Sequence, residues 1–301
     1  TLDGSTLYVG THGSRFYAVN ARNGQVIWKY DNDEPISSTA RLSAGRVYFT
    51  DLGGRVIALN QSDGTLVWKQ DLSREMLGQP WVMGERLYVL KGEQTVVALS
   101  TASGGIVWEK FIRTYLRDMT MRGHSAIQGD GGSLYVGLGD GHLYSLSASS
   151  GDVLWDKNLT LPLRTFKDID ARVVIEGDAL YVGGYFGAVY KLNKRSGATL
   201  WSSDVATGVP VLIHDEVVVV SDAQGTLMGL DKNDGSRLWA NELNGAVLSA
   251  PVNFGDKIFV STFKESAFLI SSEDGNQVQR LAVGEGAITE PVVDGDHIYL
   301  F

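Results

Sequence analysis

A short motif recurs seven times along this chain, and it sets narrow limits on the fold. Each copy has an apolar run, a turn that contains Gly, and a second apolar run. In six copies a Trp stands four residues after the turn Gly, and in the seventh, FLISSEDGNQVQ, Gln279 takes that place. The Trp positions are 28, 68, 108, 155, 201 and 239. Self-similarity at a nearly constant period predicts a series of like structural units.

Within each unit the local signals are those of β-strands. Segments such as RVYFT at 46–50 and SLYVG at 133–137 are short and rich in β-branched and aromatic residues. Pairs such as Asn23-Gly24 and Asp63-Gly64 favour hairpin turns, which need positive φ. No stretch of ten residues shows helical periodicity. Four short strands per roughly 40 residues predict an all-β propeller of four-stranded antiparallel blades, with PQQ/WD40-like repeats.

The ends of the sequence bear on the number of blades. We interpret 6–9 as the second strand of a blade, and 287–293 with 297–301 as two strands without a following outer hairpin. Seven outer hairpins and this half-blade predict one domain, 1–301, with eight blades and terminal strands missing. Seven blades with one redundant strand is the alternative. We expect the recurring Trp to cover the joint between adjacent blades rather than to stack on a ligand.

Composition excludes several classes of function. The 301 residues carry 26 Lys and Arg against 35 Asp and Glu, and no Cys. A net charge of −9 disfavours a nucleic-acid or anionic-membrane surface. The absence of Cys excludes disulfides and thiolate metal sites. No apolar run reaches the roughly 20 residues of a membrane span. The chain opens on TLDG, without a signal-peptide pattern and without an initiating Met, so we interpret it as a trimmed or mature product.

The sequence contains no complete catalytic motif, and we predict that the protein is not an enzyme and binds neither a metal nor a cofactor. Gly123-His124-Ser125 begins like a nucleophile elbow but lacks the closing Gly. Asp31-Asn32-Asp33 resembles the start of a calcium loop that Pro35 interrupts. The five His never occur at metal-ligand spacing. The glycines of 137–141 lie between two predicted strands and indicate a hairpin turn.

The repeat is irregular at two consecutive connections. The spacings between equivalent positions are 40, 40, 47, 46, 38 and 40 residues, so the third and fourth connections carry insertions, at 111–125 and 159–172. Outer-strand-to-next-blade connections of a propeller share one rim, so we expect the two insertions to lie side by side. Their Arg, Met and aromatic residues are typical of a protein-binding patch, whereas ordinary loop-length variation is the alternative.

Here the sequence resembles a known family. The repeats are similar to quinoprotein-type propeller repeats, and the insertions resemble those of the BamB-like lipoproteins of the outer-membrane β-barrel assembly (BAM) machinery. That family carries Leu-Ser-Leu-Arg-Gly-Glu-Ser-Ala after the third repeat, where this chain has MTMRGHSA at 119–126. It carries Ser-Asp-Val-Asp after the fourth, where this chain has KDID at 167–170.

The resemblance implies a scaffold rather than an enzyme. Its members are eight-bladed propellers that a lipid anchors to the periplasmic face of the Gram-negative outer membrane, through a Cys that would stand upstream of residue 1 here. They bind the periplasmic POTRA domains of BamA, and whether unfolded outer-membrane protein clients also bind stays open. The resemblance implies that the partner-binding residues are Met119, Met121, Arg122, Asp168 and Asp170.

Two other classes of function remain as alternatives. A PQQ-dependent dehydrogenase shares the repeat, but such enzymes are longer and typically cover the cofactor with a vicinal Cys pair that this chain lacks. A periplasmic propeller that binds a small ligand in its central channel is the other.

Overall fold

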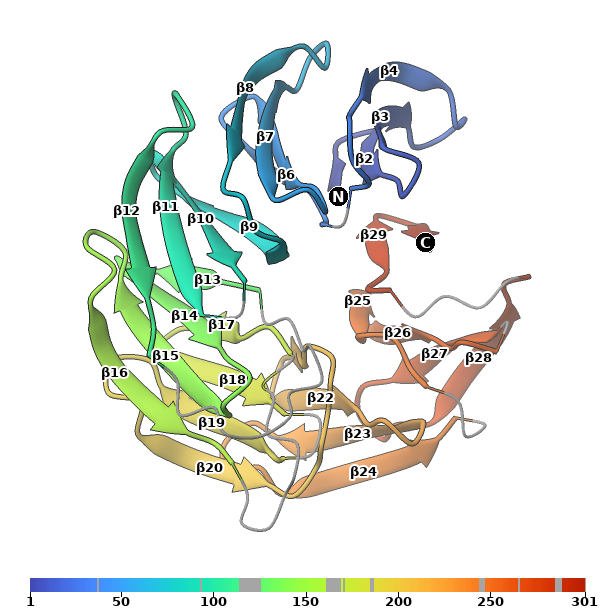
Figure 1. Cartoon of the computed structure of the whole chain (residues 1–301). Coiled ribbons are helices and arrows are strands. Elements are labelled where there is room, and N and C mark those ends of the chain that lie inside the picture. The colour runs from blue at the N-terminus through green and yellow to red at the C-terminus, as the bar shows by residue number, and fades with distance from the viewer. Residues whose placement is uncertain are drawn as a thin grey trace. The chain divides into compact units, whose positions relative to one another are not determined.

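The structure, a computed structural model, describes residues 1–300 except 37, 93, 114–125, 161–168, 170, 185–186, 244–246, 265 and 285–288. All of the secondary structure described is β, and Figure 1 labels most of the strands. The described residues include no helix that could span a membrane. The chain divides into two compact units. Among the described residues, the first runs from Thr1 to Leu154 without Gly139–Leu143, which belong to the second unit together with the residues from Trp155 onward.

The first unit holds three antiparallel sheets of four strands, which follow one another in chain order (Figure 1). The first sheet is β1 (Leu2–Asp3), β2 (Thr6–Gly10), β3 (Arg15–Asn20) and β4 (Val26–Asp31). The second is β5 (Arg41–Ser43), β6 (Arg46–Thr50), β7 (Arg55–Asn60) and β8 (Leu66–Asp71). The third is β9 (Met76–Met83), β10 (Arg86–Lys91), β11 (Thr95–Ser100) and β12 (Ile106–Phe111).

The division between the units passes through the strands of the fourth sheet. That sheet is β13 (Gln128–Asp130), β14 (Ser133–Gly137), β15 (His142–Ser147) and β16 (Val153–Asn158). The 137–141 segment joins β14 to β15, so the prediction of a hairpin turn there is confirmed.

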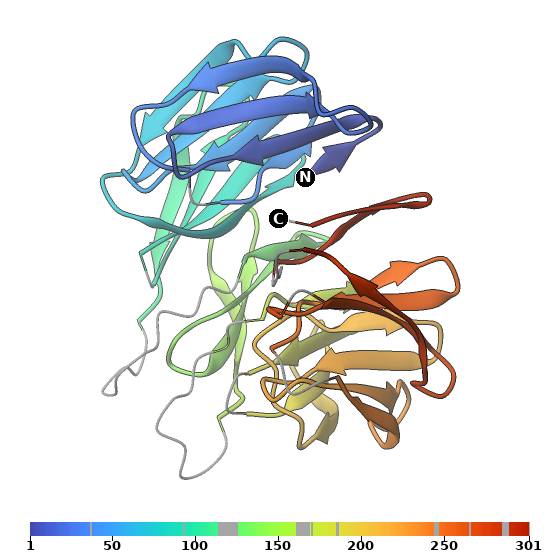
Figure 2. The ribbon, with the colours of Figure 1, turned by 90° about the vertical axis from the view of Figure 1, so that its right-hand side faces the viewer.

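The second unit holds three further four-stranded sheets and a two-stranded one. The fifth sheet is β17 (Val174–Glu176), β18 (Ala179–Gly183), β19 (Val189–Asn193) and β20 (Thr199–Ser203). The sixth is β21 (Leu212–His214), β22 (Val217–Ser221), β23 (Thr226–Asp231) and β24 (Arg237–Glu242). The seventh is β25 (Val252–Phe254), β26 (Lys257–Ser261), β27 (Ser266–Ser271) and β28 (Gln277–Ala282). Beside it lie β29 (Val292–Asp294) and β30 (His297–Tyr299), the red hairpin of Figure 2.

These strands confirm the all-β prediction and the four-stranded antiparallel blade. Residues 6–9 lie in the second strand of the first sheet, as predicted. The expectation that the first strand of this blade is missing is wrong, because β1 pairs with β2 through Leu2 and Leu7 and completes the sheet. A two-residue strand is too short to show a hydrophobic period, so the sequence pattern could not reveal it. Seven complete sheets and one pair of strands are described, and the count of eight blades, with terminal strands missing, stays a prediction.

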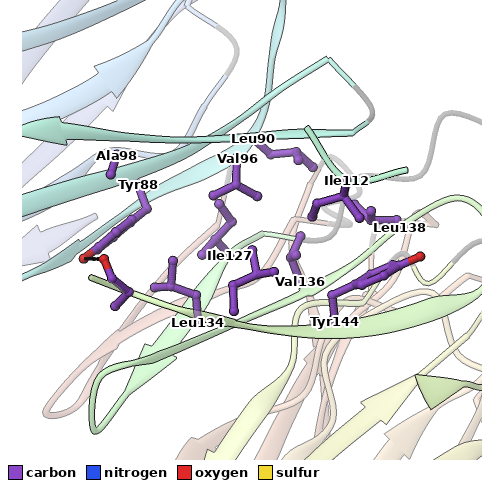
Figure 3. Packing of buried hydrophobic residues seen from close by; sticks show 12 residues of the cluster. Tyr88, Leu90, Val96, Ala98, Ile112, Ile127, Leu134, Val136, Leu138 and Tyr144 are labelled. Atoms are coloured by element: carbon purple, nitrogen blue, oxygen red, sulfur yellow. Dashed lines mark hydrogen bonds between the residues drawn. The ribbon is translucent and has the colours of Figure 1, made fainter. Parts of the chain in front are cut away.

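The hydrophobic core lies between sheets that are consecutive in the chain. One cluster joins Tyr88 and Val96 of the third sheet to Leu134 and Val136 of the fourth, all at most 1% exposed (Figure 3). Middle strands are buried on both faces, as the 0–1% exposure of residues 47–49 in β6 shows. This burial explains why they read as unbroken apolar runs.

The recurring Trp fastens each outer strand to the next sheet. The indole N–H of Trp28 donates to the backbone carbonyl of Gln61 in the outer hairpin of the second sheet, at 3.0 Å. The other five indoles donate in the same way, at 2.9–3.2 Å, to the carbonyls of Thr101, Ala148, Lys194, Lys232 and Ser272. The prediction that these Trp residues pack at joints is confirmed.

The turn Gly of the next sheet lies against the same indole. A Cβ atom built on Gly64, whose φ is +72°, would stand 2.4 Å from Trp28, so only Gly fits beneath the ring. Gly104, Gly151, Gly197, Gly235 and Gly275 meet the preceding indole at 2.3–2.8 Å. Gln279 holds the equivalent position on the outer strand of the seventh sheet, where it pairs with Leu269 of β27.

Candidate functional site

The five predicted partner-binding residues, Met119, Met121, Arg122, Asp168 and Asp170, lie outside the described residues. The two insertions can therefore be followed only at their ends, where they join the sheets.

Both ends of the first insertion are anchored in one core cluster. Ile112 follows β12 directly, is 3% exposed, and donates its backbone N–H to the carbonyl of Gln94 at 2.8 Å. At the other end Ile127 is 2% exposed in the same cluster (Figure 3). The backbone of Ala126 lies against Gly78, where a Cβ atom would stand 3.1 Å from the Cα of Ala126. The fold thus fixes where this insertion leaves and re-enters the first unit.

The second insertion leaves and re-enters the second unit in a similar way. Leu159 is 6% exposed, its N–H donates to the carbonyl of Gly141 at 2.9 Å, and its carbonyl accepts from the Tyr190 hydroxyl at 3.2 Å. On the return, Ile169 and Ala171 are 3% and 1% exposed. The ends of the predicted surface are therefore built into the core, as a rigid support for an interface requires.

A bidentate ion pair lies where the second insertion ends. The two guanidinium nitrogens of Arg172 contact the two carboxylate oxygens of Glu290, which is 118 residues later, with Nη2 and Oε1 2.6 Å apart. Sequence reasoning placed Arg172 in the insertion but found no partner for it, because nothing in the repeat pairs these two positions. The pair borders a hollow of about 360 Å³ lined by residues of β17, β21 and β25.

The acidic residues that resembled a calcium loop are paired with cations. Asp31 contacts Arg15 at 3.1 Å, and Asp33 contacts Arg55 at 2.7 Å and Lys69 at 3.0 Å. The hydrogen bond from Lys69, with a contribution from Arg55, lowers the pKa of Asp33 below its usual range. Within the described ranges, no group of three or more His, Asp or Glu residues could hold a metal ion.

The imidazole rings of two described His residues have local polar contacts. Nδ1 of His142 lies 3.1 Å from Asp156, and Nδ1 of His214 lies 2.7 Å from Asn253. Neither contact includes a Ser or Thr hydroxyl that a base could activate. A second hollow, of about 730 Å³, is bordered by His214, Asp256 and Glu273 and is open to solvent.

Comparison with protein families gives a match over both halves of the chain. The family model described as "Outer membrane protein assembly factor BamB" matches residues 12–191 and 186–301. A protein of that name from Pseudomonas aeruginosa is 36% identical over 86 residues, which are 28% of this chain and 23% of the relative. The aligned segment thus spans about a quarter of that relative's length.

Solved structures share the fold over nearly the whole chain. BamB from Moraxella catarrhalis superimposes with a TM-score of 0.87 at 20% identity, over 96% of this chain and 88% of that one. A quinohemoprotein alcohol dehydrogenase from Comamonas testosteroni gives 0.80 at 14% identity, over 97% of this chain and 68% of the enzyme. At these identities the likeness shows the propeller fold and does not separate a scaffold from an enzyme.

Proposed function

The chain belongs to the family of the outer membrane protein assembly factor BamB, and on that premise we propose that it is a non-catalytic scaffold subunit of the BAM complex. In this proposal it binds the periplasmic POTRA domains of BamA and assists the folding and insertion of outer-membrane proteins. It works at the periplasmic face of the Gram-negative outer membrane, held there by an N-terminal lipid. The observation that carries the proposal is the family match, which extends from residue 12 to residue 301.

The proposed contact site consists of Met119, Met121 and Arg122 on the first insertion with Asp168 and Asp170 on the second. A guanidinium binds a carboxylate through two parallel hydrogen bonds, which suits Arg122 as a central anchor. Methionine side chains fill irregular apolar pockets. Asp168 and Asp170 alternate along the chain and would face basic groups on the partner. Support comes from the anchored ends of both insertions, at Ile112, Ile127, Leu159 and Ile169.

The test is a calorimetric titration of the full chain against isolated POTRA domains of BamA. Arg122→Glu should weaken binding by about 2 kcal/mol or more, because interface hot spots centre on such anchors. Polar substitutions of Met119 and Met121 should cost less singly and add together. Asp168→Ala with Asp170→Ala should weaken binding and reduce its dependence on salt.

Asp63→Asn and Asp234→Asn are the matched controls, since both residues lie in outer hairpin turns away from the insertions in sequence. They should leave the affinity unchanged. Thermal melts report whether each variant folds. An Arg122→Glu variant that folds normally and binds as tightly as the unmodified chain would contradict the site, and a chain that binds no POTRA domain would contradict the function.

A further inference from the structure

The strand that leads into the first insertion breaks the pattern of its repeat. The third residue after the recurring Trp position is exposed in every sheet from the first to the seventh. In most copies it is acidic or an amide, and one copy has Ala. Those residues are Asp31, Asp71, Asn158, Asp204, Glu242 and Ala282. The third sheet alone places a large apolar side chain there, Phe111, which is 63% exposed.

Two residues further on, just past the end of β12, the chain carries a cation where the other copies have none. The equivalent positions hold Asp, Ser, Thr, Ala, Asn and Gly, and the third sheet has Arg113. Arg113 is exposed, and no hydrogen bond or ion pair joins it to a described residue. Neighbouring charges on the strand are neutralised. Glu109 pairs with Lys91 at 2.6 Å, and Lys110 pairs with Asp152 at 3.1 Å.

The residue between them fixes the direction of both side chains. Ile112 is buried among the residues of Figure 3, and its N–H bonds to Gln94. Alternate residues of an extended chain point to opposite sides, so burial of Ile112 turns Phe111 and Arg113 outward together. The residue that pairs with Phe111 on β11 is Thr95, which is too small to cover the ring. The fold itself gains little from either side chain.

We infer that Phe111 and Arg113 form a second binding element for the POTRA domains, continuous in the chain with the first insertion. This inference rests on the proposed function and names residues that it does not include. An exposed aromatic beside a guanidinium that pairs with none of the described residues is a composition enriched at binding hot spots. The pair requires an apolar recess for the ring and, close to it, a carboxylate for Arg113, which sets the chemistry of the matching patch on the POTRA domains.

The experiment compares substitutions at the two ends of one strand. Phe111→Asp installs the residue that three other sheets carry at this position, so the variant should fold. Ile106→Asp on the same strand, where Ile106 is 50% exposed, introduces the same charge and removes a similar apolar surface. Titration against POTRA domains should show affinity reduced about tenfold or more by Phe111→Asp and by Arg113→Glu, and unchanged by Ile106→Asp.

Each result separates this inference from the proposed function. Unchanged affinity in Phe111→Asp and Arg113→Glu, with affinity lost in Arg122→Glu, would overturn the second element and leave the function standing. Equal losses in Phe111→Asp and Ile106→Asp would also overturn it, because the effect would then follow charge and not position. Sedimentation of the chain alone completes the test. Self-association that Phe111→Asp abolishes, without a change in POTRA affinity, would assign the patch to a second copy of the chain.

Discussion

At the scale of single residues, the Asp side chains of the hairpin turns show how local hydrogen bonds favour the ionised form of a carboxyl group. Oδ1 of Asp63 accepts hydrogen bonds from the hydroxyl and the backbone N–H of Thr65, at 2.7 and 2.9 Å. In the sixth sheet Asp234 accepts from the N–H of Ser236 at 2.8 Å. These bonds favour the ionised carboxylate, so the pKa of each Asp is lowered. The interpretation of Asp63 as a turn former is confirmed.

A pH dependence follows from these lowered pKa values. A carboxyl whose pKa is lower in the folded than in the unfolded state stabilises the fold above the unfolded pKa, near 3.9, and loses that contribution as pH falls through the folded pKa. Asp63→Asn removes the charge and keeps the shape. We expect its Tm to lie below that of the unmodified chain at pH 7, and the gap to close at pH 2–3. Circular-dichroism melts at both pH values check this, and a gap independent of pH would contradict it.

At the same scale, the candidate site shows which features could not be predicted from the sequence alone. The five proposed contact residues came from a family resemblance rather than from geometry, and the described residues leave them untested. The sequence placed Phe111 in an insertion. Its exposure depends on the side to which its side chain points at the end of β12, and the strand pattern alone does not give that side. The available signal was the comparison of equivalent repeat positions, where Phe111 replaces residues such as Asp31 and Asp71.

At the scale of elements, the joint between consecutive sheets is the unit of construction. Each joint combines one indole, one backbone carbonyl and one Gly turn, so that stability depends on pairs of neighbours. The repeat predicted these joints because Trp and Gly recur at fixed spacing. It did not predict the β-bulge beside the outer strands of six sheets, which shifts the register between Ala18 and Val19 in the first sheet, or the two-residue β1. Neither feature leaves a periodic trace in the sequence.

The joint can be tested with two glycines in equivalent turns. Gly24 and Gly64 both have φ of +72°, but Gly24 has no atom within 4 Å of an added Cβ, whereas Gly64 lies under Trp28. Ala in the left-handed conformation costs about 1–2 kcal/mol, and this is the expected loss for Gly24→Ala. Gly64→Ala should lose clearly more, because Trp28 must move and its hydrogen bond to Gln61 weakens. Denaturant titrations of both variants measure the difference, and equal losses would show that the indole does not depend on the turn.

At the scale of the whole molecule, one fold serves both scaffolds and quinone enzymes, so function depends on what each chain adds to the repeat. This chain adds two insertions and no Cys. We expect incubation with pyrroloquinoline quinone and calcium to give no stoichiometric complex and no alcohol- or aldose-dependent dye reduction. Calorimetry and absorbance spectra check this, with a quinoprotein dehydrogenase as the positive control. A tight complex with new absorbance would favour the enzyme.

The direction of the joints also has a consequence for the time course of folding. Each indole bonds to a carbonyl 31–40 residues later in the chain, and none of the six bonds backwards. Because the N-terminal part of a chain emerges first, the outer strand of each sheet is present before the 31–40 residues that lead to the partner of its indole have followed. During that interval its apolar face is open to chaperones and to misassociation. After the strand that contains position 279, no outer hairpin follows among the described strands. The chain has Gln there in place of Trp, and water can form hydrogen bonds with the Gln amide.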